Sequence, residues 1–153
     1  MADTPELVIQ KMESALAGFS GLRYLAALTV GLSRALQTRY AFVSRQDPQK
    51  VHFGSTVVMA ENGESGKTMV YDLRDAPCRS VLGGQSLTIP CNLSDFYPGQ
   101  IGLSAYSGIP LRDAKGVVIG VLAVVSDKPF AMADVDTVLA AFASKSALAL
   151  ASA

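Results

Sequence analysis

Residues 104–126, SAYSGIPLRDAKGVVIGVLAVVS, decide the fold. The second half, VVIGVLAVVS at 117–126, is almost entirely apolar, which predicts a central strand buried on both faces. The first half, 104–111, predicts another strand, and the polar residues 113–116 predict a tight turn in which Gly116 suits a positive φ. The stretch therefore predicts a hairpin of antiparallel strands in the middle of a sheet.

The apolar strand also predicts part of the core. Side chains alternate between the two faces along a strand, so one alternate set is expected to lie under helices. Gly120 is expected at a point of close packing. The set expected under the helices is Val118, Val121, Ala123 and Val125, or its alternate neighbours.

Three further β-prone segments precede this hairpin. Residues 40–45 and 51–60 predict two strands, and residues 67–73 predict a third. Asn62-Gly63 lies between the second and the third and is a strong signal for a two-residue hairpin loop. With the hairpin at 104–126, these segments predict an antiparallel sheet of five to six strands.

Helices are expected at both ends of the chain. Residues 4–6, Thr-Pro-Glu, form a helix start, because Thr can cap the helix, Pro fits its first turn and Glu faces its positive end. Residues 22–36 predict a second helix with leucines at helical spacing, and residues 132–153 predict a last one. Grouped helices beside hairpin strands indicate the α+β class.

The middle segment, residues 74–103, follows no period. It is rich in Pro and Gly, and only residues 77–82 predict a short helix. About thirty irregular residues inside a compact domain are typical of a functional loop.

Composition excludes several classes of protein. Of 153 residues half are hydrophobic and 17% are charged, which excludes disorder. Thirteen basic and thirteen acidic residues give a formal net charge of zero, and no basic cluster indicates nucleic-acid binding. The chain begins with an acidic stretch instead of a signal peptide, and its longest apolar run, of about ten residues, is too short to span a bilayer. Two cysteines make no disulfide framework, so we expect a cytoplasmic protein.

Residues 106–124, YSGIPLRDAKGVVIGVLAV, resemble the signature of the GAF domain family. That signature is an aromatic-X-Gly-hydrophobic-Pro-hydrophobic strand, a short polar turn and a hydrophobic-Gly-hydrophobic-hydrophobic strand. Residues 71–73 (YDL) and 76–82 (APCRSVL) resemble a segment of many bacterial sensory GAF domains. The order of the elements also agrees, so the resemblance covers nearly the whole chain.

The resemblance implies a single GAF/PAS-like domain over residues 1–153. Its parts would be N-terminal helices at 1–37, a sheet and crossover at 40–127, and a C-terminal helix at 131–153. That last helix ends without a Gly or Pro stop, so we expect it to continue into a longer parent chain. The terminal helices would cover one face of the sheet. The irregular crossover would cover a ligand pocket on the other face.

The function implied is sensory and regulatory, without catalytic residues. Such domains bind small molecules in histidine kinases, diguanylate cyclases and transcription regulators, and relay occupancy through their terminal helices to an output domain. The family name does not specify the ligand. The pocket is expected to be mostly apolar, with a few hydroxyl groups, and to be lined by Tyr71, Cys78, Val81, Leu82, Phe96, Tyr106 and Ser107.

No metal or bilin cofactor is expected. One histidine, His52, and two cysteines are too few for a usual zinc site. Bilin-binding relatives attach the chromophore through a Cys followed by His, whereas Cys78 and Cys91 are followed by Arg and Asn.

Two alternatives stay open. Cys78 and Cys91 could serve a redox enzyme on the same fold, as in GAF-type free methionine sulfoxide reductases, although the fuller cysteine pattern of those enzymes is missing. The domain could also be a dimerisation spacer with a filled pocket.

The terminal helices are expected to form a homodimer. The first helix carries Leu7, Val8, Met12 and Leu16, and the last carries a second, Ala-rich face that one core stripe does not need. These features predict a two-fold dimer through residues 1–36 and 132–153. No contact of this domain with nucleic acid or with a membrane is expected.

Overall fold

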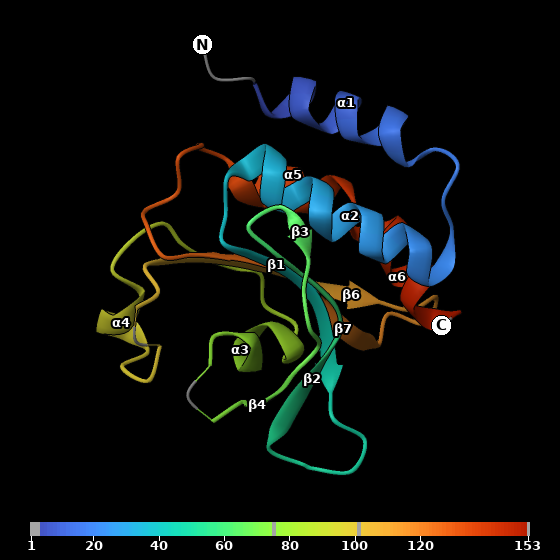
Figure 1. Ribbon diagram of the computed structural model, residues 1–153. Coiled ribbons are helices and arrows are strands. Elements are labelled where there is room, and N and C mark those ends of the chain that lie inside the picture. The colour runs from blue at the N-terminus through green and yellow to red at the C-terminus, as the bar shows by residue number, and fades with distance from the viewer. Residues whose placement is uncertain (1–3, 75, 101, 153) are drawn as a thin grey trace.

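The computed structural model describes residues 4–74, 76–100 and 102–152. One sheet lies between two layers (Figure 1). The helices near the two ends of the chain lie on one face of the sheet, and the crossover lies on the other. The helices are α1 (Pro5–Leu16), α2 (Gly21–Leu36), α3 (Cys78–Leu82), α4 (Leu93–Phe96), α5 (Val135–Ala141) and α6 (Ala143–Ala151). The strands are β1 (Tyr40–Gln46), β2 (Phe53–Glu61), β3 (Glu64–Ser65), β4 (Val70–Asp72), β5 (Leu87–Ile89), β6 (Ala105–Arg112) and β7 (Val118–Ser126).

The predicted α+β architecture is confirmed, with β7 at its centre. The strand order is β3-β2-β1-β7-β6-β5, every pairing is antiparallel, and β4 adds to the edge of β2. Within the described residues the sheet thus has seven strands, where five to six were predicted. The difference comes from short edge strands: the predicted strand at 67–73 is shortened to β4, and neither β3 nor β5 was predicted.

Thr56 explains why β4 begins at Val70, three residues later than predicted. Its backbone N–H donates to the carbonyl oxygen of Met69 at 2.9 Å, and its hydroxyl oxygen accepts from the Met69 N–H at 2.7 Å. The side chain of Thr56 therefore takes the place of one backbone partner in the ladder. The regular pairing of β4 begins only at the next residue, Val70.

The helix-side core contains the alternate neighbours of the predicted set. Leu122 and Val124 are buried against the leucines of α2, whereas Val121, Ala123 and Val125 point to the opposite face of β7. Gly120 lies on the helix side. A Cβ there would approach Leu150 Cδ2 of α6 to 2.5 Å, which confirms the predicted close packing.

The last helix starts later than predicted and is interrupted. Asp134 has φ +60°, a left-handed conformation that cannot continue a helix, so α5 begins at Val135 and not near Met132. Phe142, with φ −103° and ψ 2°, separates α5 from α6 while its side chain is buried in the helix-side core.

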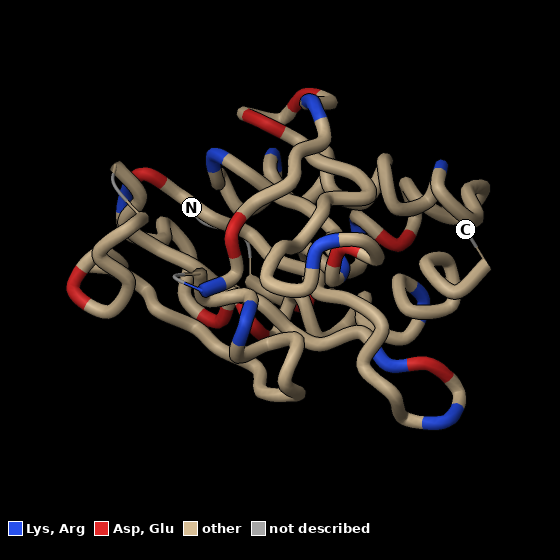
Figure 2. The backbone as a smooth tube through the Cα atoms, turned by 90° about the horizontal axis from the view of Figure 1, so that it is seen from below, with Lys and Arg blue, Asp and Glu red and all other residues tan. Residues whose placement is uncertain are grey.

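Both predicted tight turns are present. Asn62 and Gly63 have φ of +52° and +79°, as a type I′ hairpin loop between β2 and β3 requires. Gly116, with φ +83°, closes the turn between β6 and β7. Figure 2 shows basic and acidic residues interspersed along the described chain.

Ser33 fastens the β2–β3 hairpin to α2, and its removal is expected to be costly. Its buried hydroxyl donates to the Thr38 carbonyl at 2.7 Å and accepts from the Gly63 N–H at 2.9 Å. Because Ser33→Ala leaves two buried groups without this partner, we expect a loss of about 1–3 kcal/mol in the free energy of unfolding. Urea denaturation measures it, with the exposed Ser14→Ala as control. Equal midpoints for the two variants would contradict the assignment.

Candidate functional site

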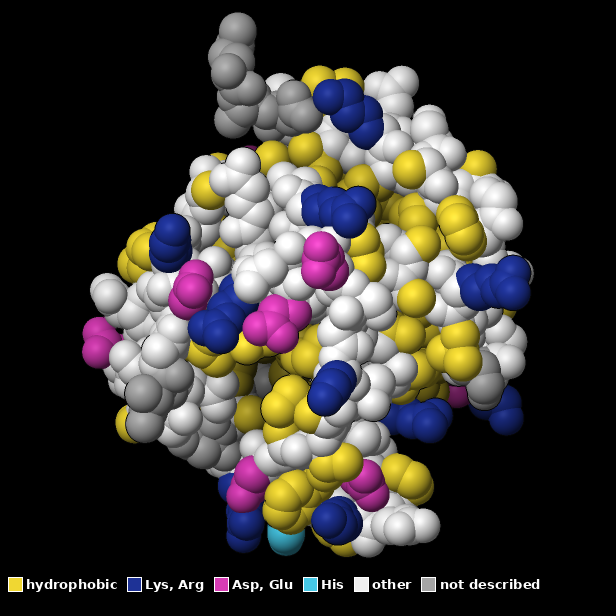
Figure 3. Space-filling view, in the orientation of Figure 1, with side chains coloured by type: hydrophobic (Ala, Val, Ile, Leu, Met, Phe, Trp, Pro, Cys, Tyr) yellow, Lys and Arg dark blue, Asp and Glu magenta, His cyan; other side chains and the backbone are white. Residues whose placement is uncertain are grey.

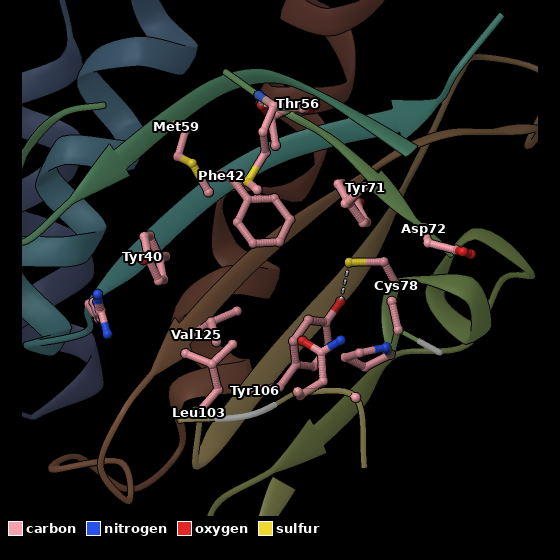
Figure 4. Close-up of a pocket in the computed structure, with 16 residues that line it drawn as sticks. Tyr40, Phe42, Thr56, Met59, Tyr71, Asp72, Cys78, Leu103, Tyr106 and Val125 are labelled. Atoms are coloured by element: carbon pink, nitrogen blue, oxygen red, sulfur yellow. Dashed lines mark hydrogen bonds between the residues drawn. The ribbon is translucent and has the colours of Figure 1, made fainter. Parts of the chain in front are cut away.

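The main cavity lies between the sheet and the crossover, on the face opposite the terminal helices. Its volume is about 590 Å³. Figure 3 shows hydrophobic side chains around a hollow on the visible face, and Figure 4 shows the residues that line the cavity. They are Arg39, Tyr40, Phe42, Thr56, Met59, Met69, Tyr71, Asp72, Ala76, Pro77, Cys78, Gly99, Gln100, Leu103, Tyr106 and Val125.

Tyr106 and Cys78 form the polar floor. The Tyr106 hydroxyl and the Cys78 thiol share a hydrogen bond of 3.1 Å, drawn as a dashed line in Figure 4. Tyr106 comes from β6 and Cys78 from the first residue of α3, so this contact ties the crossover to the sheet. Both side chains are almost fully buried.

Tyr71 reaches across the sheet from its edge. Its hydroxyl makes a 2.7 Å hydrogen bond with the Ser44 hydroxyl on β1, passing over Gly54 of β2. Its ring meets that of Phe42 edge to face, with the centroids 6.4 Å apart. The path is open only because residue 54 is glycine, since a Cβ there would lie 2.8 Å from the Tyr71 ring.

A second glycine makes room for Tyr106. Gly108 lies two residues further along β6, on the same face of the sheet. A Cβ at this position would lie 2.8 Å from Tyr106 Cζ and 2.9 Å from Cε1. This geometry gives a physical reason for the aromatic-X-Gly pattern in the sequence.

The buried polar groups of the floor are held neutral. Burial raises the pKa of Cys78, Tyr106 and Tyr71, and for both tyrosines the neighbouring Cys78 adds to the rise. A protonated thiol is a poor nucleophile, so Cys78 is a hydrogen-bonding group in this state.

These shifts predict a loss of stability in alkali. The unfolded chain releases the cysteine proton near pH 8.5 and the tyrosine protons near pH 10, while the folded protein retains them. Stability from these groups is therefore complete below pH 8 and falls as the pH rises. Because burial raises the pKa of Cys78, the Cys78 part alone should lower the free energy of unfolding between pH 8 and 9.5. Urea denaturation at both pH values measures the free energy of unfolding, and Cys78→Ser should remove the part of its fall that Cys78 causes. An equal fall in Cys78→Ser and in the wild type would contradict this assignment.

Two charged residues lie on the cavity rim. The Asp72 carboxylate accepts hydrogen bonds from Arg74 Nε at 3.0 Å and from Arg74 Nη2 at 2.6 Å, which lowers the pKa of Asp72 to about 2. Arg39 stacks its guanidinium 5.1 Å from the ring centre of Tyr40. Its ion pairs with Glu61 and Asp127 are long, at 3.9 and 3.8 Å.

Three of the seven predicted site residues line this cavity: Tyr71, Cys78 and Tyr106. Val81 and Leu82 instead pack in the core beside it, on the buried side of α3. Ser107 lies on the other face of β6, where its hydroxyl shares a 2.8 Å hydrogen bond with Thr88. Phe96 is 66% exposed, because α4 directs it away from the sheet.

Several lining residues escaped the sequence prediction. Tyr40, Phe42 and Val125 alternate on the cavity face of β1 and β7, a signal that period-two counting could have found. Gly99, Gln100 and Leu103 come from irregular chain, which offers no such signal.

The other chemical candidates provide no site. His52 is exposed in the turn before β2, although the strand predicted at 51–60 included it. Cys78 and Cys91 are free thiols. In the described ranges no group of three His, Cys, Asp or Glu side chains could hold a metal ion, and no helix there is long and apolar enough to cross a membrane.

Solved structures share this fold at low sequence identity. The GAF domain of a phosphoenolpyruvate-protein phosphotransferase from Coxiella burnetii matches with a TM-score of 0.74 and 14% identity, over 97% of this chain and 93% of that one. Free methionine-R-sulfoxide reductase from Neisseria meningitidis, in complex with its substrate, matches with a TM-score of 0.71 and 17% identity, over 97% of this chain and 92% of that one. The chromophore-binding domain of a Stigmatella aurantiaca bacteriophytochrome matches with a TM-score of 0.69 and 14% identity, over 97% of this chain and 60% of that one.

Comparison with curated protein sequences finds no match. The family model described as "GAF domain" matches residues 22–150, which contain the whole sheet, the cavity and most of the helical layer. The strand–turn–strand signature and the order of the elements agree with that match. The chain therefore belongs to the GAF domain family.

Proposed function

We propose that this chain is a regulatory GAF domain that binds a small molecule in the cavity and has no catalytic activity of its own. The observation that supports this most is the cavity itself. It is mostly apolar, has a few convergent polar groups, and has a volume typical of small-molecule sites, about 300–1,000 Å³. Two proteins of similar fold are described as a chromophore-binding domain and as an enzyme in complex with its substrate.

Occupancy would be relayed through the terminal helices to an output domain, such as a histidine kinase or a diguanylate cyclase, in bacterial signalling. The cytoplasm is the proposed compartment, since two free thiols persist in a reducing environment.

A homodimer through the terminal helices is part of the proposal. Val8, Met12 and Leu16 of α1 are buried within the protomer, so they do not supply the interface. Phe19, Leu22 and Leu148 remain 44%, 49% and 71% exposed. Sedimentation at micromolar concentration should show a dimer that Leu22→Glu with Leu148→Glu converts to a monomer. A wild-type monomer would overturn this part.

Ligand binding is tested by native mass spectrometry of the purified protein and by thermal shift against a metabolite library. A ligand that binds only the folded state raises the midpoint as its concentration rises. Leu103→Trp fills the cavity from its loop side and should abolish the shift. Leu82→Trp, in the adjoining core, is the matched control. No co-purified ligand and no shift would favour a spacer and overturn the proposal.

A redox enzyme is the second candidate, because Cys78 lines the cavity and the Neisseria reductase shares the fold. The reaction would reduce methionine sulfoxide to methionine and water while two thiols become a disulfide. The raised pKa of Cys78 argues against it as the attacking thiol. Turnover of free methionine sulfoxide that Cys78→Ser abolishes would establish the enzyme.

A further inference from the structure

We propose that the ligand of this cavity is a small aromatic molecule with one anionic group, and that Arg39 binds the anion at the cavity mouth. This inference rests on the proposed function and specifies the chemical class of its ligand.

The walls of the cavity favour an aromatic body. Four rings line it: Tyr40 and Phe42 from β1, Tyr71 from β4 and Tyr106 from β6. Figure 4 shows the ring of Phe42 between Tyr40 and Tyr71 along one wall. Met59, Leu103 and Val125 complete an apolar lining that suits a flat ring system in stacked or edge contacts.

Among the described residues that line the interior, no charged side chain is available to pair with a buried charge. The Tyr106 hydroxyl and the Cys78 thiol bind each other, and the Tyr71 hydroxyl binds Ser44. All of these groups are neutral, and an ion without a partner is costly to bury. A charged group on the ligand must therefore lie at the rim, where Arg39 and Asp72 line the cavity.

Of these two residues, Arg39 is the better placed to bind a ligand. Arg74 already holds both carboxylate oxygens of Asp72, at 2.6 to 3.2 Å. Arg39 has its nearest carboxylate oxygens at 3.8 and 3.9 Å, beyond hydrogen-bond distance. Exposed ion pairs of this kind contribute little to stability. The guanidinium can therefore exchange them for a bidentate contact with a carboxylate or phosphate of the ligand.

The surroundings of Arg39 add positive charge. Arg39 also lines a second cavity of about 370 Å³, between the end of α2, the β2–β3 hairpin and the end of β7. Arg34 and Lys128 line that cavity with it, so three basic residues stand against two acids, Asp127 in the lining and Glu61, which pairs with Arg39. The end of the main cavity next to Arg39 is therefore electropositive, which favours an anion over a cation.

Three probes of matched shape test the charge. 1-Naphthylacetate, 1-naphthylacetamide and 2-(1-naphthyl)ethylamine carry a similar ring with an anionic, a neutral and a cationic group. Calorimetric or NMR titration at low salt should show the acetate binding about tenfold more tightly than the amide, as a charge-assisted hydrogen bond provides. Arg39→Gln should bring the two affinities to about equal, while binding of the amide stays unchanged. Arg45→Gln is the control, because Arg45 is an exposed arginine of β1 that lies outside the cavity, whereas Arg39 comes just before β1.

Each result decides the inference. Equal binding of acetate and amide, tightest binding of the amine, or a preference that survives Arg39→Gln would overturn it. If no probe binds but a metabolite shifts the wild type and not Leu103→Trp, the ligand class is wrong and the proposed function stands. If nothing binds and Leu103→Trp behaves as the wild type does, both fail.

Discussion

Val121→Asp is expected to unfold the protein or to lower its free energy of unfolding by about 4 kcal/mol or more. Val121 is fully buried in β7, paired with Ser44 of β1 on one side and with Pro110 of β6 on the other. It packs in the core between the sheet and the crossover, in a cluster of described apolar and neutral side chains that cannot neutralise a new carboxylate. Because an ordinary domain is stable by only 5–15 kcal/mol, roughly, the loss is a large part of the total.

Val117→Asp is the matched control for this experiment. Val117 lies just before β7, carries the same side chain and is 56% exposed. Its substitution should change stability by no more than about 0.5 kcal/mol. Urea denaturation followed by far-UV circular dichroism compares the two variants. Similar midpoints would show that β7 is not the central buried strand.

The sequence predicts the centre of the fold better than its edges. The apolar run of β7 and its hairpin with β6 are specified by local pattern and by turn residues, which act over a few positions. The short strands β3, β4 and β5 depend on what lies beside them. Thr56 delays the start of β4 through a contact with Met69, 13 residues away, a distance at which no local pattern operates.

The candidate site was only partly predictable for the same reason. Tyr106 and Ser107 are neighbours in one strand and must face opposite sides, so alternation alone would have removed Ser107 from the predicted set. Arg39 has no such signal. Its place at the mouth follows from the meeting of the start of β1 with Gly99, Gln100 and Leu103, which only the folded chain brings together.

Gly108→Ala is expected to lower the free energy of unfolding by about 2 kcal/mol and to disturb the cavity floor, because it overpacks a buried site. The new methyl group would meet the Tyr106 ring at less than 3 Å. Tyr106 is 1% exposed and its hydroxyl is hydrogen-bonded to the Cys78 thiol. The ring therefore cannot move aside without breaking the contact between the sheet and α3. Gly18→Ala is the control, since a Cβ there meets nothing within 4 Å.

A double-mutant cycle separates this clash from a general cost of alanine in the strand. Tyr106→Leu removes the ring atoms that the methyl group would meet. In that background Gly108→Ala should cost about 0.5 kcal/mol or less, which leaves a coupling energy of about 1.5 kcal/mol between the two positions. Gly54 needs no change in this experiment, because the ring next to Gly54 is that of Tyr71 and not that of Tyr106. Equal costs in both backgrounds would mean that the glycine serves the backbone of β6, and the aromatic-X-Gly pattern would then need another explanation than room for the ring.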